Sequence, residues 1–406
     1  MDLGRRGTGA RGDGHREAVS PRGADAVCAA CLLVVAACGG GDGQPGVTRV
    51  DSAGVEIVSY GGPDVPLAWT FDSLLALGGA EAGEASFFEL SRSSVAVDGL
   101  GNLYVMDRAA KRVAVFDSTG RPVRTMGRPG GGPGELQWPF ALAVTPGGRT
   151  AVFDIGKGGL VRFGPAGEPL DQVPVTAGYA GGAIHLTETS LVLPVRTGGG
   201  AEARSTSELL RIVGADTVRL ASKPEPPGTL VELKSCGMSM TGLPPIFTPT
   251  LRWGATGERV AVTTVAEYVL LLLDGADTVH IVRRDLDPEA ATAEAAARQV
   301  GNRMRVITPG GERVCDAGEV VAQQGVADRI PVVVEIASGP DGTWWVRRHG
   351  EAGIDVIGAD GAYLGTLPRT APFPVAVMPG NRITAIVRDD MDVDHLVIYR
   401  VRAASQ

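Results

Sequence analysis

The chain has 406 residues and a formal net charge of −8 at pH 7, with 58 glycines, 27 prolines and 44% hydrophobic residues. It is long enough to bury a large core, and its acidic balance argues against nucleic acid as a partner because phosphate backbones repel an acidic surface. The many glycines and prolines predict frequent turns between short apolar runs, which favours an all-β fold over a helical one.

The first 37 residues have the layout of an export signal. Five arginines precede a 12-residue apolar run at 26–37, which is too short to span a bilayer and is typical of a signal peptide. The run ends in Val35-Ala-Ala-Cys38, which resembles a lipobox, the site at which bacterial lipoproteins are lipidated on cysteine and cleaved. The resemblance implies a lipoprotein signal peptide at 1–37 and a lipid anchor on Cys38. It also implies a place in the bacterial cell envelope, expected to be the outer membrane, facing the periplasm or the exterior. Residues 38–50 begin with a glycine-rich stretch and are predicted to be a flexible tether.

A pair of glycine-marked turns, nineteen residues apart, recurs three times in the chain. The pairs are Gly101 with Gly120, Gly148 with Gly167, and Gly342 with Gly361. Short β-rich runs lie around these turns, which predicts four antiparallel strands in each unit. The first two copies are 47 residues apart, within the roughly 40–50 residues that one blade of a β-propeller occupies.

Three weaker copies of the repeat bring the predicted number of units to six. They lie at 184–213, 253–275 and 379–401. We therefore predict an all-β, six-bladed β-propeller over residues 51–406. Because an open ring would expose a strand edge, a β-prone run before the first unit is expected to pair with the last strand at 395–401. The candidate runs are 55–60, 67–71 and 74–77.

One short helical insertion is predicted between the fourth and fifth blades. Asp287 is its expected N-cap and Pro288 its first helical residue, followed by an alanine-rich run to Val300 and a stop at Gly301. A lid or packing element is the expected role of this helix, and docking of a partner is the alternative.

Two cysteines remain after the leader is removed and Cys38 is lipidated. Cys236 lies in a proline-rich insertion before the fourth unit, and Cys315 lies in the insertion after it. An even pair in an oxidising compartment predicts a disulfide. Separate burial of the two side chains as small apolar groups is the alternative.

Part of the repeat resembles a known family. The segment Gly130-Gly-Gly-Pro-Gly-Glu-Leu136 leads into an apolar strand, which is similar to the NHL-type six-bladed propeller repeat. In that repeat an aspartate follows the second strand, and Asp107 and Asp154 match it. The match is close only over 95–167, while the architecture is similar over 66–402. More narrowly, the chain resembles bacterial six-bladed β-propeller lipoproteins.

The region after the leader contains no catalytic or cofactor motif that we recognise, so no cofactor is predicted. The histidines there are isolated from one another, whereas a zinc site needs three or four converging ligands. These histidines are His185, His280, His349 and His395.

The acidic cluster at 389–394 is the one candidate cation site. Asp390, Asp392 and Asp394 would share a face of an extended segment, where their oxygens suit a hard cation such as calcium. A solvated loop between two strands of the last blade is the alternative interpretation.

Two classes of function remain open from the sequence. The first is a membrane-anchored binding or scaffolding module whose ligand is a protein, peptide or glycan. The second is a calcium-dependent lactonase-like hydrolase or lyase, in which a cation in the central channel polarises a carbonyl. Only three asparagines are present in the chain. This scarcity of amide ligands favours the binding module.

Overall fold

The computed structural model describes residues 46–79, 87, 90–175, 178–198, 205–301, 303–308 and 311–403. All of them belong to one compact unit, Gln44–Gln406. The predicted signal peptide 1–37, the predicted lipidation site Cys38 and the tether up to residue 45 lie outside the described residues. No helix in the described part of the chain is long and apolar enough to cross a membrane.

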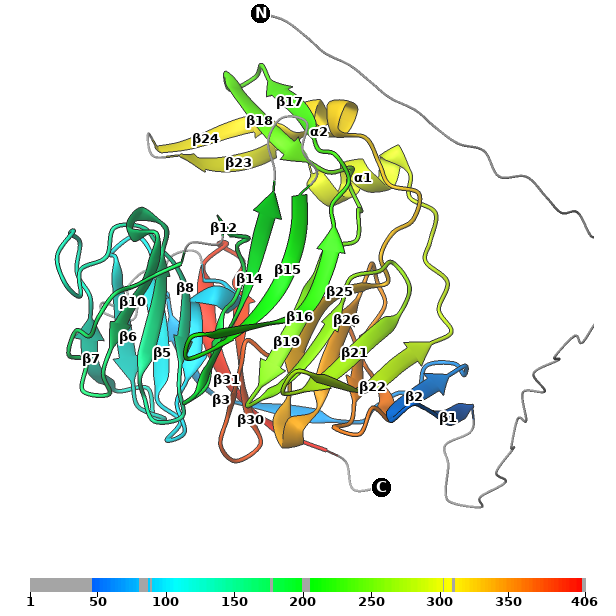
Figure 1. Cartoon of the computed structure of the whole chain (residues 1–406), viewed down its shortest axis with the longest axis horizontal. Coiled ribbons are helices and arrows are strands. Elements are labelled where there is room, and N and C mark those ends of the chain that lie inside the picture. The colour runs from blue at the N-terminus through cyan, green and yellow to red at the C-terminus, as the bar shows by residue number, and fades with distance from the viewer. Residues whose placement is uncertain are drawn as a thin grey trace, which may run out of the picture. The chain divides into compact units, whose positions relative to one another are not determined.

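The described chain is mostly β-strand, arranged in many small sheets (Figure 1). The first two sheets are antiparallel meanders of four strands each. One contains β4 (Val95–Val97), β5 (Leu103–Asp107), β6 (Arg112–Phe116) and β7 (Pro122–Met126), preceded by the 3-10 turn η2 (Arg92–Ser94). The other contains β8 (Pro139–Val144), β9 (Thr150–Asp154), β10 (Gly159–Phe163) and β11 (Val173–Pro174), with η3 (Ile155–Lys157) after β9.

The paired glycines of the repeat occupy equivalent turns in these sheets. Gly101 and Gly148 lie between the first and second strands, with φ of 83° and 84°. Gly120 and Gly167 lie between the third and fourth strands, with φ of 84° and 91°. These left-handed conformations favour glycine. The equivalent turns of successive sheets therefore explain why glycine pairs recur nineteen residues apart in the sequence.

The third and fourth sheets carry additional strands. In the third, β14 (Ser190–Gly198), β15 (Ser205–Val213) and β16 (Asp216–Pro224) form a meander, and two short strands pair with β14. These are β12 (Gly178–Tyr179) and β13 (His185–Leu186). The fourth sheet contains β19 (Arg252–Thr256), β20 (Arg259–Thr263), β21 (Val269–Asp274) and β22 (Asp277–Arg284), extended by β2 (Val55–Tyr60) and β1 (Val47–Ser52).

The end of the predicted tether is therefore wrong, because residues 47–50 belong to a strand. β1 pairs antiparallel with β2 through the turn at Ala53 and Gly54, where φ is 56° and 85°. Two consecutive positive φ values are typical of a tight hairpin turn. The hairpin then joins the fourth sheet by parallel pairing of β2 with β22.

The fifth and sixth sheets again contain four strands each. The fifth has β25 (Val333–Ser338), β26 (Trp344–Arg348), β27 (Ile354–Ile357) and β28 (Tyr363–Leu367), with η4 (Pro340–Gly342) after β25. The sixth has β29 (Ala376–Met378), β30 (Arg382–Arg388), β31 (Asp394–Arg402) and β3 (Thr70–Gly78). The expected pairing of an early run with the last strand is confirmed, since β3 runs antiparallel to β31 from Thr70 opposite Arg402 to Gly78 opposite His395.

Apolar clusters join each of these sheets to the next. For example, Leu142 and Val152 of the second sheet pack with Tyr104 and Val113 of the first. Equivalent clusters lie between the second and third, third and fourth, fourth and fifth, and fifth and sixth sheets. A further cluster joins the sixth sheet to the first, where Leu396 packs with Leu103 and its neighbours.

An insertion lobe stands apart from these sheets, at the top of Figure 1. We define it as residues 229–250 and 288–331. It contains two hairpins and two helices: β17 (Thr229–Leu233), β18 (Met238–Leu243), α1 (Ala293–Val300), β23 (Arg303–Thr308), β24 (Gly311–Asp316) and α2 (Ala317–Gln324). Its small core includes Val231, Leu233, Cys315 and Val320.

The predicted helix begins later than expected, and a second helix was not predicted. The N-cap of α1 is Thr292, whose hydroxyl accepts a hydrogen bond from the amide of Ala295 at 3.1 Å. Residues after Asp287 are extended instead of helical, because the backbone of Glu289 and Ala291 pairs with the 328–330 segment. The stop at Gly301 is confirmed. α2 is short and follows its N-cap Asp316 without a sequence pattern long enough to predict it.

Candidate functional site

One central cavity, with a volume of about 670 Å³, is lined by residues of all six sheets. The lining comes from β4, β8, β13, β19, the end of β25 and β29. Side chains such as Val97, Leu142 and Leu186 make much of the wall apolar. One strand of each of the six sheets therefore faces a common space.

Arg92 crosses from the first sheet to the fourth and fifth. Its guanidinium donates to the carbonyl oxygen of Ile336 and, at 3.3 Å, to that of Trp253. Burial lowers the pKa of Arg92, and the charge of Glu335 opposes that effect. Arg92 lines both the central cavity and a second cavity of about 480 Å³. We call the second cavity the side cavity.

The carboxylates that line the side cavity each form an ion pair with a neighbouring cation. Three glutamates line it. Their partners are Arg219 for Glu208 at 3.0 Å, Lys223 for Glu225 at 3.0 Å, and Arg347 for Glu335 at 3.1 Å. None of these partners is Arg252, which lines the same cavity.

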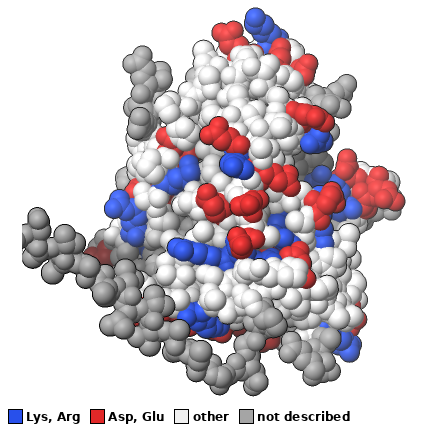
Figure 2. Space-filling model, turned by 90° about the vertical axis from the view of Figure 1, so that its right-hand side faces the viewer, with Lys and Arg blue, Asp and Glu red and all other residues white. Residues whose placement is uncertain are grey.

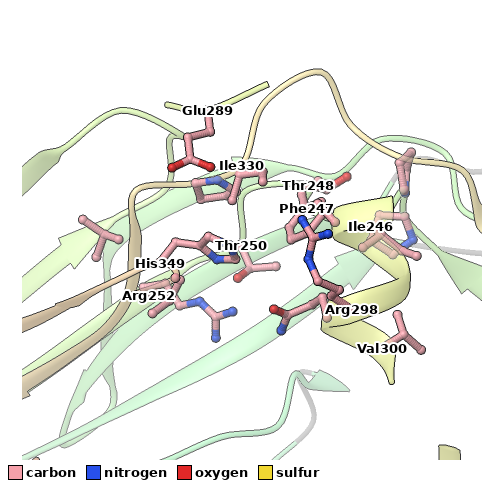
Figure 3. Close-up of a pocket in the computed structure, with 18 of the residues that line it drawn as sticks. Ile246, Phe247, Thr248, Thr250, Arg252, Glu289, Arg298, Val300, Ile330 and His349 are labelled. Carbon is pink, nitrogen blue, oxygen red and sulfur yellow. The ribbon is translucent and has the colours of Figure 1, made fainter. Parts of the chain in front are cut away.

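A third cavity lies between the insertion lobe and the fourth and fifth sheets (Figure 3), and we call it the lobe groove. Its volume is about 830 Å³. It shares Thr250, Arg252 and Val334 with the side cavity. The two cavities therefore meet at the start of β19.

Apolar side chains of the lobe and of the sheets form much of the groove wall. Ile246 and Phe247 come from the segment before β19, Val300 from the end of α1, and Ile330 from the segment before β25. Phe247 contacts the ring of His349 edge-on, with 5.7 Å between the ring centroids. An apolar ligand surface could pack against this wall.

Arg252 is the one arginine of the groove lining for which the described residues provide no ion-pair partner. It is the first residue of β19, its side chain is exposed, and its guanidinium projects into the groove (Figure 3). Desolvation lowers the pKa of Arg252 even though the charge of Glu335 opposes the shift. The groove lining therefore includes an exposed cation with which no described carboxylate forms an ion pair.

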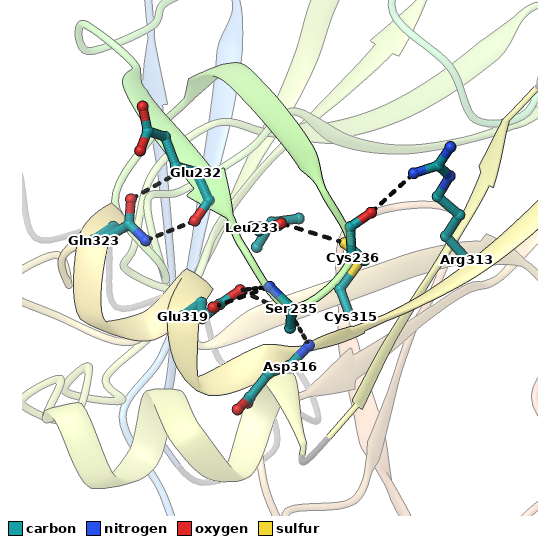
Figure 4. Close-up of a disulfide and its surroundings, with 9 residues drawn as sticks. All are labelled: Glu232, Leu233, Ser235, Cys236, Arg313, Cys315, Asp316, Glu319 and Gln323. Carbon is teal, nitrogen blue, oxygen red and sulfur yellow. Dashed lines mark hydrogen bonds between the residues drawn. A yellow bond between two sulfur atoms is a disulfide. The ribbon is translucent and has the colours of Figure 1, made fainter.

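The structure brings Cys236 and Cys315 together (Figure 4). Their sulfur atoms are bonded across a sequence separation of 79 residues, with 5.1 Å between the Cα atoms. The bridge connects the β17–β18 turn to the end of β24. Next to it, the hydroxyl of Ser235 donates to Glu319 at 2.8 Å and accepts from the amide of Asp316 at 2.8 Å.

The predicted cation cluster does not form, because its segment turns. Asp392 has φ of 61°, so the three aspartates do not share one face of an extended segment. Asp394 is buried and accepts from the amide of Leu90 at 2.9 Å and from Arg388 at 3.0 Å. Asp390 is exposed in the turn. The segment is the loop between β30 and β31.

The two aspartates that match the NHL pattern have structural roles. The carboxylate of Asp154 is fully buried and accepts from the amides of Gln137, at 2.7 Å, and Trp138, at 2.9 Å. Asp107 accepts from the amide of Ala110 at 2.9 Å. Both therefore accept hydrogen bonds from backbone amides of neighbouring loops.

The four histidines lie in separate environments. Burial lowers the pKa of His185, whose ring nitrogen is 2.9 Å from the carbonyl oxygen of Gly257. His280 faces Glu56 at 3.2 Å, and His395 faces Asp389 at 2.9 Å. Within the described ranges, no three histidine, cysteine, aspartate or glutamate side chains are grouped so that they could hold a metal ion.

Acidic and basic side chains are interspersed on the face shown in Figure 2. Such mixing differs from the continuous basic stripe that is typical of nucleic-acid-binding surfaces.

No protein-family model and no curated protein matches this chain. Its fold is similar to that of several solved proteins. An exported protein from Bacteroides fragilis is 12% identical, with a TM-score of 0.47, over 86% of this chain and 100% of that one. A member of the DUF4221 family from Bacteroides vulgatus is 10% identical, with a TM-score of 0.46, over 83% and 99%. A gluconolactonase from Xanthomonas campestris is 12% identical, with a TM-score of 0.36, over 87% and 100%.

Proposed function

We propose that this protein is an exported bacterial lipoprotein whose six-bladed β-propeller is a binding module, with its ligand site in the lobe groove. The ligand would be a protein, peptide or glycan. The anchor would be a lipid on Cys38 in the outer membrane, with the propeller facing the periplasm or the exterior.

The proposal of a closed six-bladed ring is supported by the packing of the sheets. Apolar clusters join consecutive sheets, and one of them joins the sixth sheet to the first. The last sheet takes its outer strand, β3, from the beginning of the described chain. Such pairing of early and late segments closes a ring without leaving an open strand edge.

The lobe groove is the observation that carries the proposed binding role. Ligand sites in proteins are typically concave spaces of about 300–1,000 Å³, mostly apolar, with a few placed polar groups. The groove has a volume of about 830 Å³, a largely apolar wall and Arg252, which has no ion-pair partner in the described part of the chain. A concave space, an apolar wall and an available cation are properties of a binding site. Binding, unlike catalysis, needs no reactive group in the groove.

The lactonase-like alternative needs carboxylates or amides that converge in the channel. The acidic residues that line the central cavity are Asp98, Glu188 and Glu258, and each is already engaged by neighbours. Asp98 accepts from Asn102 and Tyr104, Glu188 pairs with Arg149, and Glu258 pairs with Arg211. No described cluster therefore favours this alternative.

Photo-cross-linking tests the binding site. A photoreactive amino acid at Thr250, an exposed groove residue, is expected to form adducts in intact cells. The same residue at Val123, which is 50% exposed on the outer strand β7, is the control and is expected to form none of these adducts. Identical adduct patterns from the two positions, or none from Thr250, would contradict the proposed site.

Replacing Cys38 by serine tests the anchor. Without the thiol no diacylglycerol can be attached, so Cys38→Ser is expected to abolish lipid labelling and to leave the protein unprocessed or released from the membrane fraction. Cys31→Ser, which changes a cysteine earlier in the apolar run, is the control and is expected to label normally. Normal labelling of Cys38→Ser would refute the assignment.

A further inference from the structure

We propose that the lobe groove binds an apolar ligand by its carboxylate group and that Arg252 is the residue that pairs with that carboxylate. This proposal deepens the proposed function and depends on it. It narrows the ligand from a broad class of macromolecules to one chemical feature.

The charges of the groove favour an anion. Five arginines and two glutamates line it, although the whole chain has a net charge of −8. Four of the arginines have carboxylate partners: Arg298 with Glu294, Arg347 with Glu335, Arg348 with Asp355, and Arg369 with Glu351. Arg252 is the remaining one.

The nearby acidic groups do not neutralise Arg252. Glu335 is engaged by Arg347 at 3.1 Å, and Glu351 is engaged by Arg369. Glu289 lies beside Ile330 at the opposite rim of the groove (Figure 3). A ligand carboxylate would thus meet a guanidinium that has no competing partner among the described residues.

The chemistry of arginine suits a carboxylate. A guanidinium presents parallel N–H donors that match the two oxygens of a carboxylate, and such paired hydrogen bonds are shorter and stronger than neutral ones. Desolvation lowers the pKa of Arg252, and the negative charge of a bound carboxylate would act in the opposite direction, as Glu335 does.

The wall next to Arg252 favours an aliphatic ligand over a sugar. Sugar-binding sites commonly stack the ring on an exposed tryptophan or tyrosine, and the groove lining contains neither. Its apolar members are aliphatic side chains, prolines, methionines and Phe247. Among the ligand classes of the proposed function, this lining favours an apolar peptide that offers its C-terminal carboxylate. A free aliphatic acid is the alternative that the test distinguishes.

Calorimetric titration of the purified domain with two matched probe pairs tests the proposal. One pair is a leucine tetrapeptide with a free C-terminal carboxylate and the same peptide as an amide. The other is decanoate and decanamide. At least one carboxylate is expected to bind about 10-fold more tightly than its neutral analogue, as a charge-assisted pair would provide. The pair that shows this difference identifies the source of the carboxylate.

Three variants locate the effect. Arg252→Gln is expected to abolish the preference for carboxylates, and Arg252→Lys to retain part of it. Arg283→Gln is the matched control, because Arg283 is exposed on β22 outside the groove lining and should leave all affinities unchanged. Arg252→Gln should also leave the melting temperature unchanged, because the residues that the structure describes form no ion pair with Arg252.

The outcomes separate the two proposals. Carboxylate and neutral probes that bind equally, with Thr250→Trp weakening both, would overturn the role of Arg252 while leaving the groove as the ligand site. A carboxylate preference that survives Arg252→Gln would also overturn it. Absence of binding by every probe would overturn the carboxylate proposal, and the cross-linking at Thr250 would then decide the proposed site independently.

Discussion

Replacing Asp355 by alanine is expected to lower the free energy of unfolding by about 3–5 kcal/mol, the usual cost of leaving buried charges without a partner. Asp355 in β27 is fully buried. Its carboxylate accepts from Arg284 at 2.7 Å and lies 3.3 Å from Arg348. The side chains of both arginines are less than a tenth exposed.

Few neighbouring groups could replace the Asp355 carboxylate as a partner of Arg284 and Arg348. The half-exposed Asp64 pairs with both arginines, and it would be the only ion-pair partner that the described residues offer them. Arg284 also lies 4.2 Å from the ring centroid of Tyr363. Because Arg284 belongs to the fourth sheet and Arg348 to the fifth, the loss would weaken the junction between two sheets.

Thermal unfolding measures this effect. For a domain of this size, a loss of about 4 kcal/mol corresponds to a fall in melting temperature of roughly 5 °C. Asp360→Ala is the matched control, since Asp360 lies in the turn after β27 and pairs with Arg49 at the surface. An exposed pair contributes only about 0–1 kcal/mol. Equal melting temperatures for the two variants would show that the buried network is not needed for stability.

Removing the bridge between Cys236 and Cys315 is expected to loosen the insertion lobe. The bridge closes a loop of 79 residues, which corresponds to about 4 kcal/mol in the chain-entropy model. The double variant Cys236→Ser with Cys315→Ser should therefore exchange amide hydrogens faster in β17, β18 and α2. The sheets β4–β7 and β8–β11 should exchange at the original rate, because they form separate clusters.

Single variants distinguish a bridge from separate packing of two thiols. If the bridge stabilises the lobe, Cys236→Ser alone should loosen it as much as the double variant does. If the cysteines pack separately, each change should have its own smaller effect and the two should add. Mass spectrometry of a non-reduced digest provides the direct check, and two alkylatable thiols in protein isolated from its native host would refute the bridge.

The repeat could be found in the sequence because its signal is local. A turn that needs a left-handed residue selects glycine wherever the turn recurs, so Gly101 and Gly148 marked equivalent turns before any packing was known. The strand that pairs with β31 was also expected, because an unpaired edge is unfavourable in any ring of sheets. The start of α1 at Ala293 was not expected from the sequence, because the 328–330 segment forms hydrogen bonds with the backbone of residues 289–291.

The sequence by itself determined the β-rich class, the repeated units and the pairing of early and late strands, since these follow from short-range turn chemistry and strand patterning. The tertiary structure alone decided the lobe groove, because its walls come from segments far apart in the chain, such as Phe247, Val300 and Ile330. It also decided which arginine of the groove lining has no ion-pair partner among the described residues. Nothing in the sequence distinguishes Arg252 from the other arginines. In the structure, Glu335 pairs with Arg347 and Glu351 pairs with Arg369, so neither of these groove-side glutamates is left to pair with Arg252.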